Sequence, residues 1–194
     1  MSLPVTNTTR PFPRDYSKAV GKIYHRKVHS LSSGKSVTLI CKVPNPVLRA
    51  SSIISTLESI STVHPALVDG LTIIVFDRQN MPVKNCYGLY KSRTIYLCNN
   101  MVDRSNPTIT ADPYRFDSKF RTMLFNHYFV LAVGSTGAAF RVTQESYNHY
   151  MTEFVLLHEL GHAWNELQGT VSPIFAEEES NANEFAVCFI SSLT

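Results

Sequence analysis

The chain has 194 residues, of which 44% are hydrophobic and 17% are charged. This composition excludes a disordered polyampholyte and fits one folded domain. The sequence contains neither an apolar run long enough to span a membrane nor a secretory signal at its start, so we expect a cytoplasmic protein. Its four cysteines (Cys41, Cys86, Cys98 and Cys188) have no CxxC spacing, which excludes a cysteine-only zinc ribbon and favours reduced thiols.

Charge is distributed unevenly along the chain. The formal net charge is +3, but residues 1–49 contain nine Lys or Arg and one acid, Asp15, so this segment carries +8 and the other 145 residues carry −5. We predict a basic N-terminal arm over residues 1–45 and a main domain over 46–194. A basic arm can contact nucleic acid, but this one has no array of stacking aromatics. The favoured interpretation is that it lies on the protein's own acidic side.

A strand and a helix are predicted after the first basic residues. The segment 36–43 (SVTLICKV) is a candidate short strand. Asn45-Pro46 is typical of a helix start, and apolar residues at helical spacing predict a helix over 46–63. His64-Pro65 ends this helix, because the residue before a proline disfavours the helical conformation.

The next segments have the pattern of a small sheet. The β-branched run LTIIVFD (71–77) predicts a buried strand. Residues 86–98 predict a hairpin with a turn near Lys91-Ser92. We expect its second arm, 93–98, to be an edge strand beside which an extended peptide could pair.

The second half of the chain is predicted to be mainly helical. We expect a loop over 102–115 and a helix over 117–133. Thr143 and Glu145 are typical of a helix start, and that helix runs to Leu167, with Gly169 as its stop. A last helix is predicted over 176–192. This order of elements makes the fold class α+β.

The predicted helix 143–167 contains His158-Glu159-Leu160-Gly161-His162, an HExxH motif. Four residues at about 100° each put both imidazoles on one face, one turn apart, as two ligands of a tetrahedral zinc site. Glu159 projects to the side of His158, where its carboxylate can reach a metal-bound water and act as a general base. Gly161 leaves room for a close neighbour.

A catalytic zinc ion keeps three protein ligands and one open position. The next helix begins with Glu177, Glu178 and Glu179, and we favour Glu179 as the third ligand. The residue four positions after Glu179 is Asn183, whose amide can hold the second nitrogen of a ligand histidine. Glu178 is the alternative ligand, while an acidic first turn that favours the helix dipole is enough to explain Glu177.

These motifs resemble a known family. HELGHAW (158–164) followed by EEESNANEFA (177–186) is similar to the gluzincins, which are zinc peptidases with an HExxH helix and a glutamate helix. The pattern most resembles the ImmA/IrrE-like group, whose second motif is similar to E-x-x-A-N-x-F-A. The resemblance implies that His158, His162 and Glu179 bind zinc, that Glu159 is the catalytic carboxylate, and that Asn183 supports a ligand histidine.

The resemblance also implies a fold and a function. The fold would be a minimal zincin-like core, consisting of a helix, a small three-stranded mixed sheet, the HExxH helix and the glutamate helix. The leading hypothesis is a zinc metalloendopeptidase that acts on a peptide or protein substrate. The alternative is a zinc-bound regulatory or protein-binding module that works alongside a protein regulator. We do not expect a second metal site at His25 and His29, since their segment lacks helical periodicity and a nearby acid.

Overall fold

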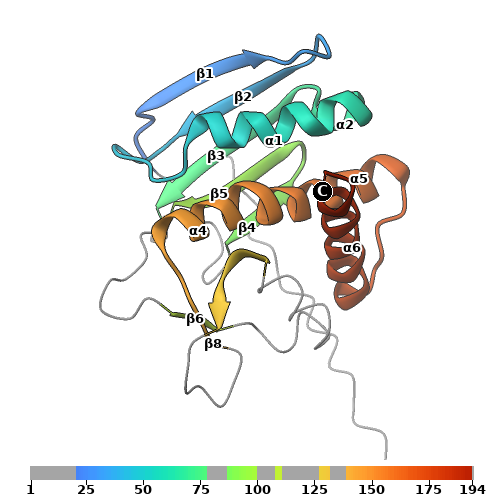
Figure 1. Ribbon diagram of the computed structural model, residues 1–194. Helices are drawn as coiled ribbons and strands as arrows, with labels where there is room; N and C mark the ends of the chain where they lie inside the picture. Colours follow the sequence, from blue (N-terminus) through green and yellow to red (C-terminus); the bar gives the residue numbers. More distant parts are fainter. Residues whose placement is uncertain (1–20, 78–86, 100–107, 111–126, 132–138, 194) are drawn as a thin grey trace, which may run out of the picture.

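The computed structural model describes residues 21–77, 87–99, 108–110, 127–131 and 139–193. Its centre is a five-stranded mixed sheet in the order β1-β2-β3-β5-β4 (Figure 1). The three inner strands run parallel, and each of the two outer strands is antiparallel to its neighbour. The strands are β1 (His25–Ser30), β2 (Ser36–Cys41), β3 (Leu71–Asp77), β4 (Gly88–Lys91) and β5 (Thr94–Asn99).

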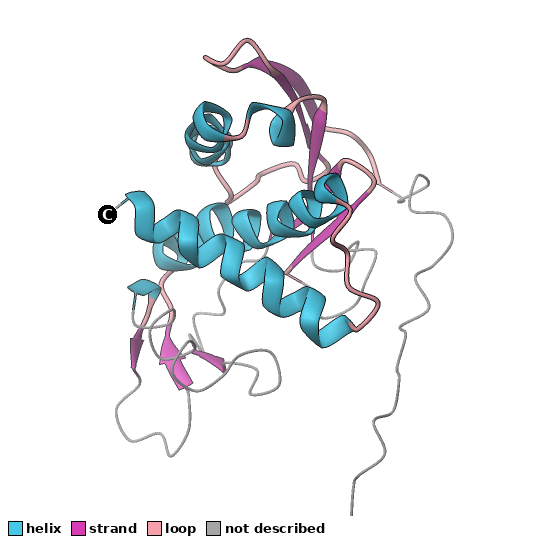
Figure 2. Cartoon of the chain, turned by 90° about the vertical axis from the view of Figure 1, so that its right-hand side faces the viewer, coloured by secondary structure: helices cyan, strands magenta, loops and turns pink. Residues whose placement is uncertain are grey.

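Helices form a layer against one face of this sheet (Figure 1). The α1 helix and the long helix that contains α5 lie in the same layer, where the Thr56 hydroxyl donates to the Thr152 carbonyl at 2.9 Å. In Figure 2 the last helix, α6, crosses the long helix. The helices are α1 (Ala50–Val63), α2 (Pro65–Val68), α4 (Gln144–Tyr150), the π-helical turn η2 (Met151–Val155), α5 (Leu156–Gln168) and α6 (Phe175–Leu193). A second, small sheet has the order β6 (Thr108–Thr110), β8 (Ala139–Arg141), β7 (Val130–Leu131).

The core lies between the sheet and the helices. Alternate residues of the inner strands point toward the helices and are buried: Val37, Leu39, Leu71, Ile73, Val75, Ile95 and Leu97. Burial of these branched side chains is the main source of stability in such a layer. The α+β class is confirmed. The sheet, however, has five strands where the resemblance implied three. The predicted strand 36–43 forms as β2 (Ser36–Cys41), while β1 was not predicted.

The two additional strands change the expected division of the chain. Residues His25–Ser30 and Ser36–Cys41 belong to the main sheet, and β2 pairs with β3 in parallel. Residues 21–45, which the prediction assigned to an arm, therefore include two strands of the main sheet. Five of the six residues of β1 are exposed, so β1 lacks the alternation of buried residues that identifies a strand. Its position is set by backbone pairing with β2.

The predicted hairpin is confirmed, but its second arm is not an edge. Ser92 and Arg93 form the two-residue turn with φ values of 47° and 62°, as a type I′ turn requires. The Arg93 guanidinium donates to the carbonyls of Ala66 and Asp69, which holds this residue in the left-handed conformation. Since β5 pairs with β3 on one side and β4 on the other, the edge strand is β4.

The first helix starts later than predicted, at Ala50. Asn99, at the end of β5, accepts from the backbone N–H groups of Val47 and Leu48 at 2.8 and 3.2 Å. This long-range bond holds the preceding residues in an irregular turn and overrides the local preference of Asn45-Pro46. The predicted end is confirmed, because α1 stops at Val63 and Pro65 opens the short α2.

The long helix with the HExxH motif is confirmed at both ends. The Thr143 hydroxyl accepts from the Ser146 N–H at 3.0 Å, and Gly169 ends the helix in the left-handed conformation with φ of 68°. The π-helical turn η2 was not predicted. The last helix also forms, over Phe175–Leu193.

Other expectations fall partly outside the described residues. The predicted helix 117–133 is wrong at its end, since Val130–Leu131 is a strand, and Thr108–Thr110 is a strand within the expected loop 102–115. Cys41 and Cys188 are free thiols, as expected, Cys98 is buried at the end of β5, and Cys86 lies outside the described residues. Within the described ranges, we find no helix with the length and hydrophobicity needed to cross a bilayer.

The contact between α5 and α6 depends on Gly161. A Cβ atom added at this position would lie 2.8 Å from Cα and 2.9 Å from the carbonyl oxygen of Ala182. Both atoms are backbone and cannot rotate away, so the absence of a side chain sets how closely the two helices approach.

We expect Gly161→Ala to lower the free energy of unfolding by about 1–3 kcal/mol, because overpacking at a backbone contact outweighs the gain in helix propensity. Urea unfolding followed by circular dichroism measures the change. The double variant Gly161→Ala/Ala182→Gly should not recover stability, since removing the Ala182 methyl leaves the backbone clash. A Gly161→Ala protein as stable as the parent would contradict the close approach.

Candidate metal centre

The two histidines of the HExxH motif face each other on α5. His158 and His162 lie one turn apart, with ring centroids separated by 4.8 Å and ring planes at 89°. Their Nε2 atoms are 3.2 Å apart. The helical spacing predicted from the sequence therefore directs two imidazole nitrogens to one point.

The third group at this point comes from α6. The Glu179 carboxylate lies with Oε2 3.6 Å from His158 Nε2 and with Oε1 3.7 Å from His162 Nε2. Within the part of the chain that the structure describes, these three residues form the one group of His, Cys, Asp or Glu whose ligand atoms all lie within 4.8 Å of one another. Residues separated by 17 to 21 positions thus meet because α5 and α6 cross here.

This arrangement fits a tetrahedral zinc ion. Zinc–nitrogen and zinc–oxygen bonds of about 2.0–2.2 Å at tetrahedral angles separate the ligand atoms by about 3.3–3.5 Å, close to the observed 3.2, 3.6 and 3.7 Å. Two imidazoles and one carboxylate are also the ligand set of catalytic zinc sites that keep one position open. The residues present therefore fit the metal that the motif implies.

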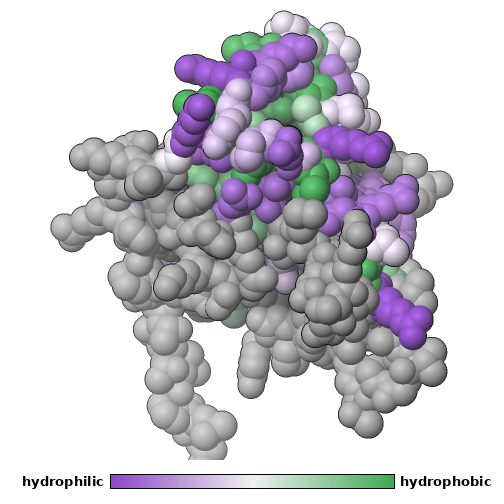
Figure 3. Space-filling model, turned by 90° about the vertical axis from the view of Figure 1, so that its left-hand side faces the viewer, coloured by the Kyte–Doolittle hydropathy of each residue, from purple (hydrophilic) through white to green (hydrophobic). Residues whose placement is uncertain are grey.

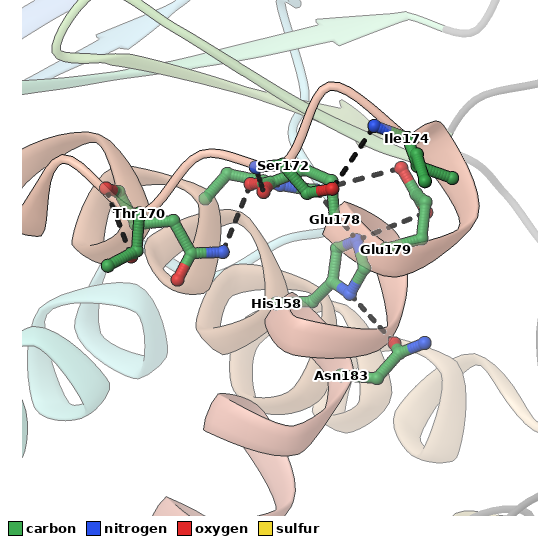
Figure 4. A network of polar contacts seen from close by, with 9 residues as sticks. His158, Thr170, Ser172, Ile174, Glu178, Glu179 and Asn183 are labelled. Carbon is green, nitrogen blue, oxygen red and sulfur yellow. Dashed lines mark hydrogen bonds and ion pairs between the residues drawn. The ribbon is translucent and has the colours of Figure 1, made fainter.

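Asn183 orients the first histidine (Figure 4). Its Oδ1 lies 2.8 Å from His158 Nδ1, and the Asn183 side chain is buried. An amide oxygen only accepts, so Nδ1 of His158 donates, which leaves the Nε2 lone pair directed at the candidate site. The sequence predicted this outer contact from the position of Asn183 four residues after Glu179.

Glu178 orients the second histidine. Its Oε1 lies 3.0 Å from His162 Nδ1 and accepts from the Asn165 amide at 3.0 Å, while Oε2 accepts from the Ser172 N–H at 3.0 Å. Burial acts to raise the pKa of Glu178, but these hydrogen bonds outweigh it and hold the pKa below its usual value.

The alternative third ligand thus has a different place in the structure. Glu178 lies on the Nδ1 side of His162, whereas Glu179 lies on the Nε2 side. Adjacent residues on a helix project about 100° apart, which places the two carboxylates on different sides of one imidazole. Sequence reasoning treated the two as competitors for one role and missed the contact between Glu178 and His162. The amide of Asn165, three residues after His162, was the available signal.

Glu159 lies against the edge strand of the sheet. Its side chain is 5% exposed, and a Cβ atom added at Gly88 of β4 would lie 2.5 Å from Glu159 Oε1 and 2.9 Å from its Cγ. The glycine therefore makes the space that the Glu159 carboxylate occupies between β4 and α5. The sequence did not single out Gly88, because the contact joins residues 71 positions apart.

His25 and His29, and the tyrosines on and beside β4 and β5, have other environments. His25 and His29 lie on β1 and do not belong to the group described above. The Tyr90 hydroxyl accepts from the Arg93 N–H in the hairpin turn, and burial raises its pKa to about 12. Tyr96 stacks on Phe76. Tyr87 lies beside Gly88, with its ring edge-on to Tyr147 at 6.2 Å.

We compared the chain with models of known protein families, with curated proteins and with solved structures, and none of the three comparisons found a significant match.

The different places of the three consecutive glutamates lead to a prediction about metal content. Purified Glu179→Ala protein should contain no stoichiometric zinc, because two imidazoles alone bind it weakly. Glu178→Ala should retain the site with an affinity about 10- to 100-fold lower, since His162 loses its orienting acceptor. Glu177→Ala is the matched control and should bind as the parent does, because Glu177 contacts the Ser172 hydroxyl and no histidine.

Elemental analysis and competition with a chelator of known affinity measure these effects. Equal zinc content and affinity in the Glu177, Glu178 and Glu179 variants would contradict the site described here.

Proposed function

We propose that the protein is a zinc-dependent metallopeptidase with a zincin-like arrangement of its sheet and helices. The observation that carries the proposal is the meeting of His158 Nε2, His162 Nε2 and the Glu179 carboxylate, with both imidazoles oriented by side chains of α6. Glu159 lies on α5 with the two histidines and supplies a carboxylate that metal binding does not require. A site for holding zinc as a structural ion has no need of that buried fourth group.

The chain's own residues have distinct roles in the proposed reaction. Bound zinc would lower the pKa of water and polarise the scissile carbonyl. Glu159 would accept the proton of the attacking water and deliver it to the leaving amine. Asn183 and Glu178 would hold the two imidazoles in the tautomer that presents Nε2. Gly88 would keep the Glu159 carboxylate close to β4.

The edge strand suggests how a peptide substrate would lie. The sequence-based expectation that a peptide pairs with 93–98 is wrong, since β5 has a neighbouring strand on each side. The strand at the sheet edge is β4, and its first residue, Gly88, contacts Glu159. A substrate extended along β4 through main-chain hydrogen bonds would therefore pass the proposed general base. We place this activity in the cytoplasm, in keeping with the free thiol of the buried Cys41.

Replacing the proposed base separates metal binding from hydrolysis. Glu159→Gln should retain its zinc and lose at least about 100-fold in kcat, because an amide cannot accept the proton. Glu184→Gln, an exposed glutamate on α6, is the matched control and should remain active. A zinc-loaded protein incubated with a broad peptide library, followed by mass spectrometry, measures the activity, and a chelator should abolish it.

Two results would overturn this assignment. Cleavage by Glu159→Gln at the parental rate would remove Glu159 from the mechanism. A zinc-loaded parent that cleaves no peptide would favour the regulatory or protein-binding module.

The contact between Gly88 and Glu159 gives a second test. Gly88→Ala should retain zinc but lower kcat about 100-fold, since a displacement of about 1 Å at a catalytic group costs this much. Leu89→Ala, in which the changed side chain points to the other face of β4, is the control and should have a smaller effect. The measurement is the rate of hydrolysis at saturating zinc. Unchanged rates in Gly88→Ala would show that the position of the Glu159 carboxylate does not depend on β4.

A further inference from the structure

The edge of the sheet farthest from the candidate metal centre is strongly basic. Residues 21–49 contain six Lys or Arg and no Asp or Glu, whereas residues 144–193 contain eight Glu and no Lys or Arg. The first group lies on and around β1 and β2, and the second on α4, η2, α5 and α6. Since β1 and β4 are opposite edges of a five-stranded sheet, four strand spacings, or about 19 Å, separate the basic edge from the strand beside Glu159.

Three of these six basic side chains have no acidic partner among the residues that the structure describes. Among the described residues, Lys35 forms an ion pair with Asp69 at 3.0 Å, while Lys22, Arg26 and Lys27 form none with an acid of that part of the chain. The expectation that the basic segment covers the protein's own acidic side is therefore not met by residues 21–45. Within this segment, β1 forms the edge of the sheet opposite to β4.

Charge that merely protects an edge strand from aggregation would account for the lysines, but this edge also exposes apolar side chains. Ile23 and Tyr24 are each 49% exposed and Val28 is 59% exposed. The ammonium group of Lys22 lies 5.3 Å from the centroid of the Tyr24 ring. In Figure 3 hydrophilic and apolar side chains intermix at the upper end of the molecule, where Figure 1 places β1. Cationic side chains attract a polyanion, and an exposed aromatic ring can stack on planar groups of the same molecule.

We propose that the β1 edge, defined as Lys22, Tyr24, Arg26 and Val28, whose alternate positions put them on the face of the sheet away from the helices, binds single-stranded nucleic acid. Lys22 and Arg26 would contact phosphates, and the Tyr24 ring would stack on a base. An unpaired strand matches this edge better than a duplex does, because the bases of a duplex are already stacked on each other and are not available to Tyr24. The surface requires neither zinc nor hydrolysis, so it stands or falls independently of the proposed peptidase activity.

Binding of the full-length protein to fluorescein-labelled dT20, measured by fluorescence anisotropy at 50 and 200 mM NaCl, tests the proposal. We expect binding that weakens with salt, and Lys22→Gln/Arg26→Gln should reduce the affinity at least about tenfold at 50 mM NaCl. The slope of log K against log salt should fall by about 1.4, or about 0.7 for each lost phosphate contact. Tyr24→Leu should weaken binding about fivefold or more at unchanged charge.

The matched control is Lys91→Gln/Arg141→Gln, which removes the same net charge from β4 and β8 and should bind as the parent does. An oligonucleotide affinity that falls equally in both double variants would reduce the effect to net charge and overturn the proposal. So would undetectable binding of dT20 by the parent, or tighter binding of a 20-base-pair duplex than of dT20.

Discussion

The close approach of two helices is the constraint on which the candidate metal centre depends. Gly161 lies between the two histidines of the motif, and its Cα faces the backbone of Ala182. Because α5 and α6 touch at this point, residues three positions before it and one position after it on the two helices are brought together. Glu179 and Asn183 flank Ala182 on α6 as His158 and His162 flank Gly161 on α5. Any side chain at position 161 would separate the helices and move the carboxylate away from both imidazoles.

Two adjacent carboxylates at the start of α6 act on opposite nitrogens of one imidazole. Glu178 accepts from His162 Nδ1, and Glu179 approaches Nε2 of the same ring. The position of His162 is therefore determined from both sides by a single helical turn. Glu178 also holds the loop between α5 and α6 through Ser172 N–H and the end of α5 through Asn165. The loop conformation and the orientation of a candidate ligand are thus linked by one side chain, which explains why a carboxylate outside the three candidate ligands is nevertheless partly buried there.

Local signals made part of this structure predictable. The Thr143 cap, the Gly169 stop and the HExxH spacing lie within one helix, and the offset between Glu179 and Asn183 lies within another, so periodicity alone places these side chains on common faces. The errors occur where distant residues decide. Asn99 delays the start of α1 through Val47 and Leu48, and β4 pairs outside β5 although the strand 93–98 has the composition of an edge. The local pattern of β1 does not indicate a strand either, because its position is set by backbone pairing with β2.

The separation of charge along the sheet has a consequence for how the two proposed surfaces work together. Clustered glutamates on α5 and α6 create a negative potential that attracts a divalent cation and repels a phosphate backbone. A polyanion would therefore be steered to the β1 edge and away from His158 and His162. If the charges were mixed, a bound strand would compete for the open side of the metal centre. Because the bases lie at the β1 edge of the sheet and the acids lie on the helices near its β4 edge, a nucleic acid at β1 and a peptide beside β4 could be bound at the same time.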